Sequence, residues 1–118
     1  MKLTEFYQTV GGDYADAMSR LQNDAFIVRF LRMLPRDGSM ALLTEAVAAS
    51  DVEKAFRAVH TLKGISLNLS LKTLAAACSD MTEALRGKTE FPAQAQSLYE
   101  TVSREYARVS AALEQLEA

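Results

Sequence analysis

Apolar residues recur along this chain every three or four positions, the spacing that places side chains on one face of an α-helix. In the N-terminal third the pattern predicts short helices over residues 3–10, 14–21 and 23–34. Asp13 is the expected N-cap of the second helix, because its side chain can accept a bond from a free N–H group. Pro35 ends the third, since proline cannot continue a helix.

From residue 39 onward the sequence predicts four more helices, each with one apolar stripe, over residues 39–49, 51–69, 71–85 and 92–116. Short connections make consecutive helices antiparallel neighbours. The stripes are Met40, Leu43 and Val47; Val52, Ala55, Val59, Leu62, Ser66 and Leu69; Leu71, Leu74, Cys78, Met81 and Leu85; and Ala95, Leu98, Val102, Tyr106, Val109, Leu113 and Leu116.

The boundaries of these helices carry recognisable signals. Asp51 and Ser70 are expected to cap the starts of two helices. Gly87 is expected just after a helix end, where glycine is common, and Pro92 in the first turn of the last helix. The predicted fold is therefore all-α, an antiparallel up-down four-helix bundle over about residues 39–117. A helical cap over about 3–35 completes a single domain spanning residues 1–118.

The composition supports this fold and narrows the function. Among the 118 residues, 49% are hydrophobic and 24% charged, with only 5 Gly and 2 Pro, so few residues break a helix. The net charge of −2 argues against a nucleic-acid partner. No apolar run approaches the roughly 20 residues of a membrane span. With a single cysteine no internal disulfide can form, and we expect a monomer in the cytoplasm.

The sequence offers few residues that could bind a metal ion or form a catalytic triad. Cys78 lies in an apolar stripe, so it is expected to be a buried small residue. One histidine and one cysteine without matched spacing do not make a metal site. The five methionines lie on apolar faces and are assigned to the core.

The single histidine, His60, lies in the middle of the helix predicted over 51–69. It follows Val59, a stripe residue, so its side chain lies about 100° around the helix from the buried stripe. That position is open to solvent and to a partner. A neutral imidazole is a nucleophile at physiological pH. Lys63, one turn further, supplies a compact positive charge suited to a phosphoryl group.

Gly64 follows one turn after His60, although glycine inside a helix costs about 0.5–1 kcal/mol relative to alanine. The apolar stripe continues past it, so the local pattern requires no break there. One explanation is close approach: without a side chain at this position, another protein can bring its active site onto the imidazole. Tight packing against another helix is the alternative explanation.

The five residues from His60 to Gly64, His-Thr-Leu-Lys-Gly, resemble the His-x-x-Lys-Gly core of histidine phosphotransfer (HPt) domains. The resemblance covers about residues 49–85 at the level of motifs, and the bundle pattern extends it to the C-terminus. It implies a four-helix bundle with an exposed histidine on its second helix. The histidine takes a phosphoryl group from an aspartate of one receiver domain and passes it to another.

Carried onto this chain, the resemblance makes His60 the phosphorylation site, Lys63 the cation that stabilises the phosphate, and Gly64 the clearance for the receiver. The partners are receiver domains of response regulators or hybrid histidine kinases. The domain is then a phosphocarrier without a cofactor and not an enzyme, since the chain has no nucleotide-binding motif. Three further residues of the same helix are expected to contribute to docking: Phe56, Arg57 and Leu67.

Two departures from the family pattern concern the end of that helix. Many members have a small residue where this chain has Leu67, and a glycine where it has Ser70.

Two other functions also stay open. The bundle could be an adaptor that binds receivers or other proteins without phosphorylation, or a purely structural element.

Overall fold

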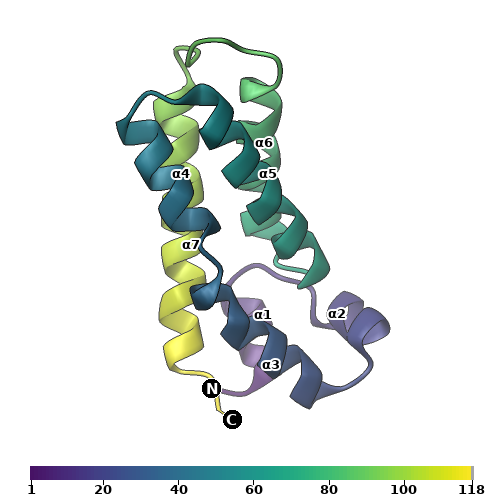
Figure 1. The fold of residues 1–118 in the computed structure, drawn as a ribbon. Helices are drawn as coiled ribbons and strands as arrows, with labels where there is room; N and C mark the ends of the chain where they lie inside the picture. Colours follow the sequence, from purple (N-terminus) through teal and green to yellow (C-terminus); the bar gives the residue numbers. More distant parts are fainter. Residues whose placement is uncertain (118) are drawn as a thin grey trace.

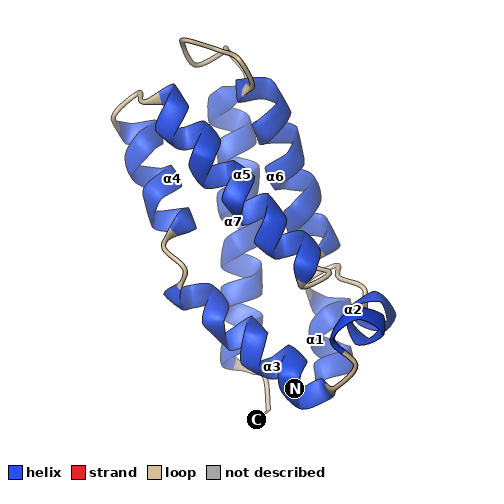
Figure 2. Cartoon of the chain, turned by 45° about the vertical axis from the view of Figure 1, so that its right-hand side comes forward, coloured by secondary structure: helices blue, strands red, loops and turns tan. Residues whose placement is uncertain are grey.

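The computed structural model describes residues 1–117, and within that range every regular element is helical (Figures 1 and 2). This confirms the predicted all-α fold. No helix of this part of the chain has the length and apolar character needed to cross a membrane. The elements are α1 (Leu3–Thr9), α2 (Tyr14–Leu21), α3 (Asp24–Met33), a 3-10 turn (Leu34–Arg36), α4 (Ser39–Ala48), α5 (Val52–Asn68), α6 (Lys72–Leu85) and α7 (Ala95–Glu114).

The four C-terminal helices form the predicted bundle. Helix α5 packs against α4 and α6, and α7 packs against α6 and α4. Helix α7 is the longest, with 20 residues, and extends past its neighbours toward the end of the molecule that holds the chain termini (Figure 1). There the Arg108 side chain donates a 3.3 Å bond to the Thr9 carbonyl, which joins α7 to the end of α1. The N-terminal helices therefore cover the end of the bundle at which α7 projects.

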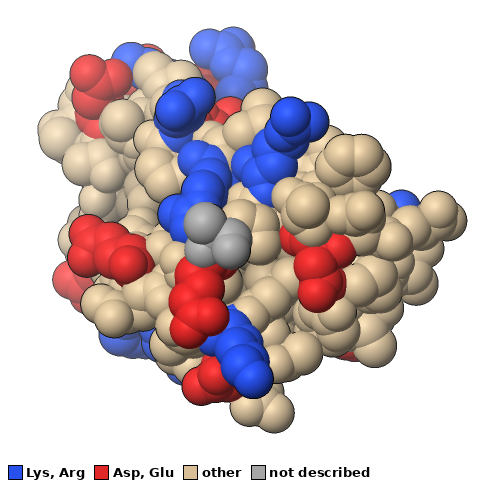
Figure 3. Space-filling view, turned by 90° about the horizontal axis from the view of Figure 1, so that it is seen from below, with Lys and Arg blue, Asp and Glu red and all other residues tan. Residues whose placement is uncertain are grey.

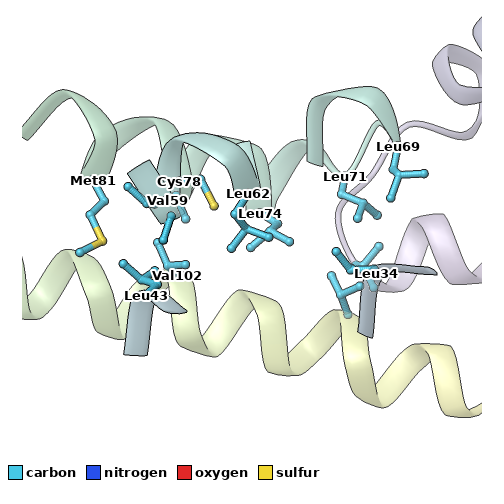
Figure 4. Packing of buried hydrophobic residues seen from close by; sticks show 14 of the residues in the cluster. Leu34, Leu43, Val59, Leu62, Leu69, Leu71, Leu74, Cys78, Met81 and Val102 are labelled. Carbon is cyan, nitrogen blue, oxygen red and sulfur yellow. The ribbon is translucent and has the colours of Figure 1, made fainter. Parts of the chain in front are cut away.

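Side chains from all four bundle helices fill one core (Figure 4). Cys78 is fully buried, as predicted, and burial raises the pKa of its thiol to about 12. The buried hydroxyls of Ser66 and Thr82 donate to carbonyls of their own helices, at 2.8 and 2.6 Å, so they enter the core without losing hydrogen bonds. Residues of the core labelled in Figure 4 include Leu43, Val59, Leu62, Leu74, Met81 and Val102.

Helix α3 has apolar residues on two faces, and only one is covered. Ile27 and Leu31 are buried, whereas Phe26, Phe30 and Met33 are exposed. The assignment of every methionine to the core is therefore wrong for Met33, whose exposed fraction is 53%. Because α3 lies at the end of the bundle, it has fewer neighbours than the central helices (Figure 1).

The end of the molecule that holds the termini carries both signs of charge. Figure 3 shows Lys and Arg side chains there among Asp and Glu side chains and many neutral residues. Arg32 is bound on this end, because its guanidinium donates a 2.8 Å bond to the Leu116 carbonyl. The N-terminal ammonium likewise pairs with Glu117 at 3.2 Å.

Three aspartate or asparagine side chains begin helices where the sequence contains a capping signal. Asp13, Asn23 and Asp51 each accept a bond from a backbone N–H in the first turn of α2, α3 and α5, respectively. The caps at Asp13 and Asp51 confirm the prediction, because a cap depends only on residues within one turn, and the cap at Asn23 adds to it.

The expected capping role of Ser70 is wrong. Helix α6 begins at Lys72, and no side chain caps it. Ser70 instead lies just past the end of α5 with φ of +57°, in the left-handed region that favours glycine. The N–H of Leu71 binds the Ser66 carbonyl at 2.9 Å, and that of Ser70 binds the Leu67 carbonyl at 3.1 Å. This is a Schellman motif, so Ser70 occupies the glycine position of that motif.

Two other boundary predictions have different outcomes. Gly87 follows the end of α6 with φ of +71°, which confirms its predicted place. Pro92 is not in the first turn of α7, because that helix begins at Ala95. The Pro92 carbonyl accepts a 3.0 Å bond from the Ala95 N–H, so the proline belongs to a turn before the helix.

An ionic cluster ties α2 to the turn between α5 and α6. Asp16 accepts bonds from the Ser70 hydroxyl at 2.7 Å and from Arg20 at 2.9 Å, and Lys72 lies 3.1 Å away. The bond from Ser70, followed by those from Arg20 and Lys72, holds the pKa of the Asp16 carboxyl well below its usual range. Arg20 also donates to the Leu67 carbonyl at the end of α5, at 3.1 Å.

The cluster predicts that Asp16→Asn destabilises the protein in a pH-dependent way. A carboxyl whose pKa is lowered by folding stabilises the folded state above its unfolded pKa, about 4, and that contribution is lost as the pH falls further. We expect the Asn variant to have a lower thermal midpoint at pH 7, with the difference from wild type shrinking between pH 4 and pH 3. Asp80→Asn, at an exposed α6 residue outside this cluster, is the control and should behave as wild type. An equal Asp16→Asn difference at pH 7 and pH 3 contradicts the assignment.

Candidate functional site

The imidazole of His60 projects from the exposed side of α5, the second helix of the bundle. Val59 and Leu62 of the same helix are fully buried. The rotation of 100° per residue therefore directs His60 outward. The structure places the histidine where the sequence predicts it.

On the side toward α6, His60 belongs to a stack of side chains. The His60 and Phe56 rings are nearly parallel, with an angle of 3° between planes and 5.8 Å between centroids. The Arg86 guanidinium lies over the Phe56 ring, 5.2 Å from its centroid. Arg86 also holds Glu83 with two bonds, from Nε at 3.2 Å and from Nη2 at 2.9 Å. Glu83 of α6 and Arg86, which directly follows α6, thus join this stack through the Phe56 ring.

The charges of residues in the predicted site act on the Glu83 carboxylate. Its pKa is lowered first by the bonds and charge of Arg86, and to a smaller extent by Lys63 and His60. Lys63 is half-buried, and within residues 1–117 no acidic side chain forms an ion pair with it. The Lys63 ammonium is therefore available to another anion near His60.

On the other side of His60, α5 and α3 form a groove of about 610 Å³. Its lining is mainly apolar, and two exposed residues of α3, Phe30 and Met33, form one wall. Gly64 also lines this groove. The remaining lining residues are Thr61, Ile65, Asn68 and Leu69 of α5 and the following turn, with Leu34, Arg36 and Asp37 of the segment after α3.

The surroundings of Gly64 decide between its two explanations. A Cβ atom placed on Gly64 has no other atom within 4 Å outside its own helix. Tight packing between helices is therefore not the reason for this glycine. The open space is on the same face as His60, one turn away, where an approaching partner can use it.

The three expected docking residues of α5 have different surroundings. Leu67 has 46% of its surface exposed and continues the face of His60 and Gly64. Phe56 is half-buried under Arg86. Arg57 is exposed and pairs with Glu53 on its own helix at 2.8 Å. Leu67 is thus open to a partner, whereas the charge of Arg57 is already partly neutralised.

Glu83, Arg86 and the exposed residues of α3 were not predicted from the sequence as part of the site. Glu83 and Arg86 are more than 20 positions from His60, so only the packing of α6 on α5 brings them near. Phe30 carried a local signal, because α3 has more apolar positions than one buried stripe needs. The structure contains no cluster of three or more potential metal ligands within residues 1–117.

The open space predicts opposite effects of alanine at two glycines. Gly64→Ala should stabilise the protein by about 0.5–1 kcal/mol, because alanine is the better helix former and meets no obstacle. Gly87 also faces open space, but its φ of +71° strains any side chain, so Gly87→Ala should destabilise. Urea unfolding of both variants measures the two free-energy changes. A loss of stability in Gly64→Ala would show a steric role that the structure lacks.

Comparison with known proteins agrees with this geometry. The family model described as Hpt domain matches residues 26–118. The match is longer than the motif region over 49–85 and takes in most of α3, while α1 and α2 precede it. No curated protein and no solved structure gives a significant match. On the family match, which covers most of its length, the chain belongs to the Hpt domain family of phosphorelay proteins.

Proposed function

We propose that this protein is a phosphocarrier in which His60 accepts a phosphoryl group from a receiver-domain aspartate and donates it to another. Members of the Hpt family have this role in phosphorelays. One observation carries the assignment to this chain: the only histidine is exposed, with open space at Gly64 one turn away.

The transfer reaction follows from the chemistry of a neutral imidazole. The lone pair of Nε2 attacks the phosphorus of the phospho-aspartate in line, and an N–P bond forms. The P–O bond to the aspartate breaks, and its electron pair stays on the carboxylate oxygen. Nδ1 keeps its proton during the step. The reverse reaction passes the group to a second receiver, whose own site holds Mg²⁺ and supplies most of the charge neutralisation.

The two sides of His60 suit two parts of this reaction. The apolar groove between α3 and α5 offers Phe30 and Met33 to an apolar surface of the receiver. Gly64 lets the receiver backbone approach, and Leu67 extends the apolar contact. Lys63, on the side toward α6, is placed to bind phosphoryl oxygens as a compact charge.

The remaining assignments are part of the same proposal. The protein acts as a monomer in the cytoplasm, because the His60 face is then free for receivers. Residues 1–118 work as one unit, since Asp16 and Arg20 of α2 are bound to the end of α5. Response regulators and hybrid histidine kinases are the partners that carry receiver domains.

The test is transfer from a phosphorylated receiver domain to wild type and to His60→Gln. Wild type should acquire an acid-labile phosphoryl label, and the Gln variant should acquire none. Its thermal midpoint should remain close to wild type, because an exposed substitution usually changes stability by less than about 0.5 kcal/mol. Labelling of His60→Gln would place the chemistry at another residue. A receiver that binds wild type without labelling it would support the adaptor function instead.

A further inference from the structure

The C-terminal end of α5 takes part of its hydrogen bonding from another helix. The last four carbonyls of a helix have no partner within that helix. Nη2 of Arg20, in α2, donates to the Leu67 carbonyl at 3.1 Å, and the same guanidinium donates to the Asn68 carbonyl at 3.4 Å. A side chain of α2 therefore completes the end of the helix that carries His60.

The turn that follows α5 is bound by the same N-terminal part of the chain. The Leu69 carbonyl accepts a 2.7 Å bond from the buried Tyr7 hydroxyl of α1. The Ser70 carbonyl accepts a 2.9 Å bond from the N–H of Asp13, the N-cap of α2. The carbonyls of residues 67–70 thus all accept bonds from α1, α2 or the cap between them, which lie at this end of α5 (Figure 2).

The backbone of Ser70 gives these bonds a specific importance. Its φ of +57° is a conformation that residues with side chains rarely adopt, and such a conformation persists only where the surrounding structure holds it. The Ser70 hydroxyl donates to Asp16 at 2.7 Å, and Arg20 donates to the oxygen of the same hydroxyl. The bonds from α2 therefore hold the turn in a conformation that serine alone disfavours.

The residues held in this way form one end of the groove beside His60. Asn68 and Leu69 line the groove, and the exposed Leu67 precedes them. His60 lies two turns earlier on α5, where the bundle core fixes the helix independently of α2. Loss of the bonds from Arg20 should therefore loosen the end of the groove and leave the histidine in place.

We propose that Arg20 is a positioning residue for receiver docking, which holds the last turn of α5 so that Leu67 and Asn68 present a fixed surface to the partner. This inference rests on the proposed function, because it takes the groove as the docking surface for a receiver. Helices α1 and α2 precede the region matched by the family model, and none of their residues lines the groove. They act on docking through the end of α5.

The experiment compares receiver binding by wild type, Arg20→Ala and Arg20→Lys in calorimetric titrations. The probe is the isolated receiver domain that binds wild type most tightly among a panel of receivers. Arg20→Ala should weaken binding by roughly three- to tenfold, because a loosened surface must become ordered when the partner binds. Arg20→Lys should recover part of the affinity, since it keeps the charge beside Asp16 but loses the planar fork.

Two further measurements distinguish positioning from a general effect on the site. At saturating phosphorylated receiver, Arg20→Ala should transfer at nearly the wild-type rate, because His60 is not displaced. Without any receiver, the amide hydrogens of Leu69, Ser70 and Leu71, which bind carbonyls of α5, should exchange faster in Arg20→Ala than in wild type.

Arg108→Ala is the matched control. Like Arg20, Arg108 pairs with a carboxylate one turn earlier on its own helix and donates to a backbone carbonyl of another element, that of Thr9 at 3.3 Å. It joins α7 to the end of α1 and does not line the groove. Its substitution should lower the thermal midpoint, as Arg20→Ala does, but leave the affinity for the receiver unchanged.

The outcomes separate this inference from the proposed function. Equal receiver affinities of wild type and Arg20→Ala overturn the positioning role, even if the receiver labels His60. An equal loss of affinity in Arg20→Ala and Arg108→Ala also overturns it, because the effect is then one of overall stability. Weaker binding in Arg20→Ala alone, by a receiver that never labels wild type, supports the positioning role and contradicts the relay. If no receiver binds wild type, both are contradicted.

Discussion

The burial of one stripe of α5 determines where the reactive side chain lies. Val59, Leu62 and Ser66 fill the space between α4, α6 and α7, and their burial fixes the rotation of the helix about its axis. Because successive residues are 100° apart, His60 must then face outward. The histidine needs no interaction of its own to be exposed. Its direction follows from the packing of its neighbours.

The same rotation gives His60 two different surroundings. Toward α6 lie Lys63, Glu83 and Arg86, so this side is polar and charged. Toward α3 lies the apolar groove that begins beside Gly64. A partner that docks by apolar contact and delivers a charged group can use both sides at once. The helix face thus separates the binding of the protein partner from the binding of the phosphoryl group.

Local patterns predicted the helices and the histidine, because their causes lie within a few residues. The predicted N-caps Asp13 and Asp51 act on backbone groups of the next turn, so the sequence shows them directly. Ser70 was assigned to the wrong helix end because its hydroxyl binds Asp16, 54 positions away.

The composition of the site was predictable on one helix only. His60, Lys63 and Gly64 share a face of α5, and their spacing alone relates them. The approach of Arg86 depends on how α6 packs on α5, and the groove depends on where α3 lies at the end of the bundle. The approach of Arg86 has no local sequence signal, and the surplus of apolar residues on α3 does not indicate which helix lies across the groove. The exposed Met33 shows the same limit of prediction from sequence, because an apolar side chain does not by itself indicate whether a neighbour covers it.

The proposed phosphotransfer depends most on the docking of a receiver over the groove beside His60. Backbone amide shifts of the ¹⁵N-labelled protein, titrated with a receiver domain that phosphorylates it, test this directly. The largest changes should fall on Thr61, Gly64 and Asn68 of α5 and on Phe30 and Met33 of α3, because these residues line the groove. Changes confined to α7 or to α1 and α2 would contradict docking at this groove.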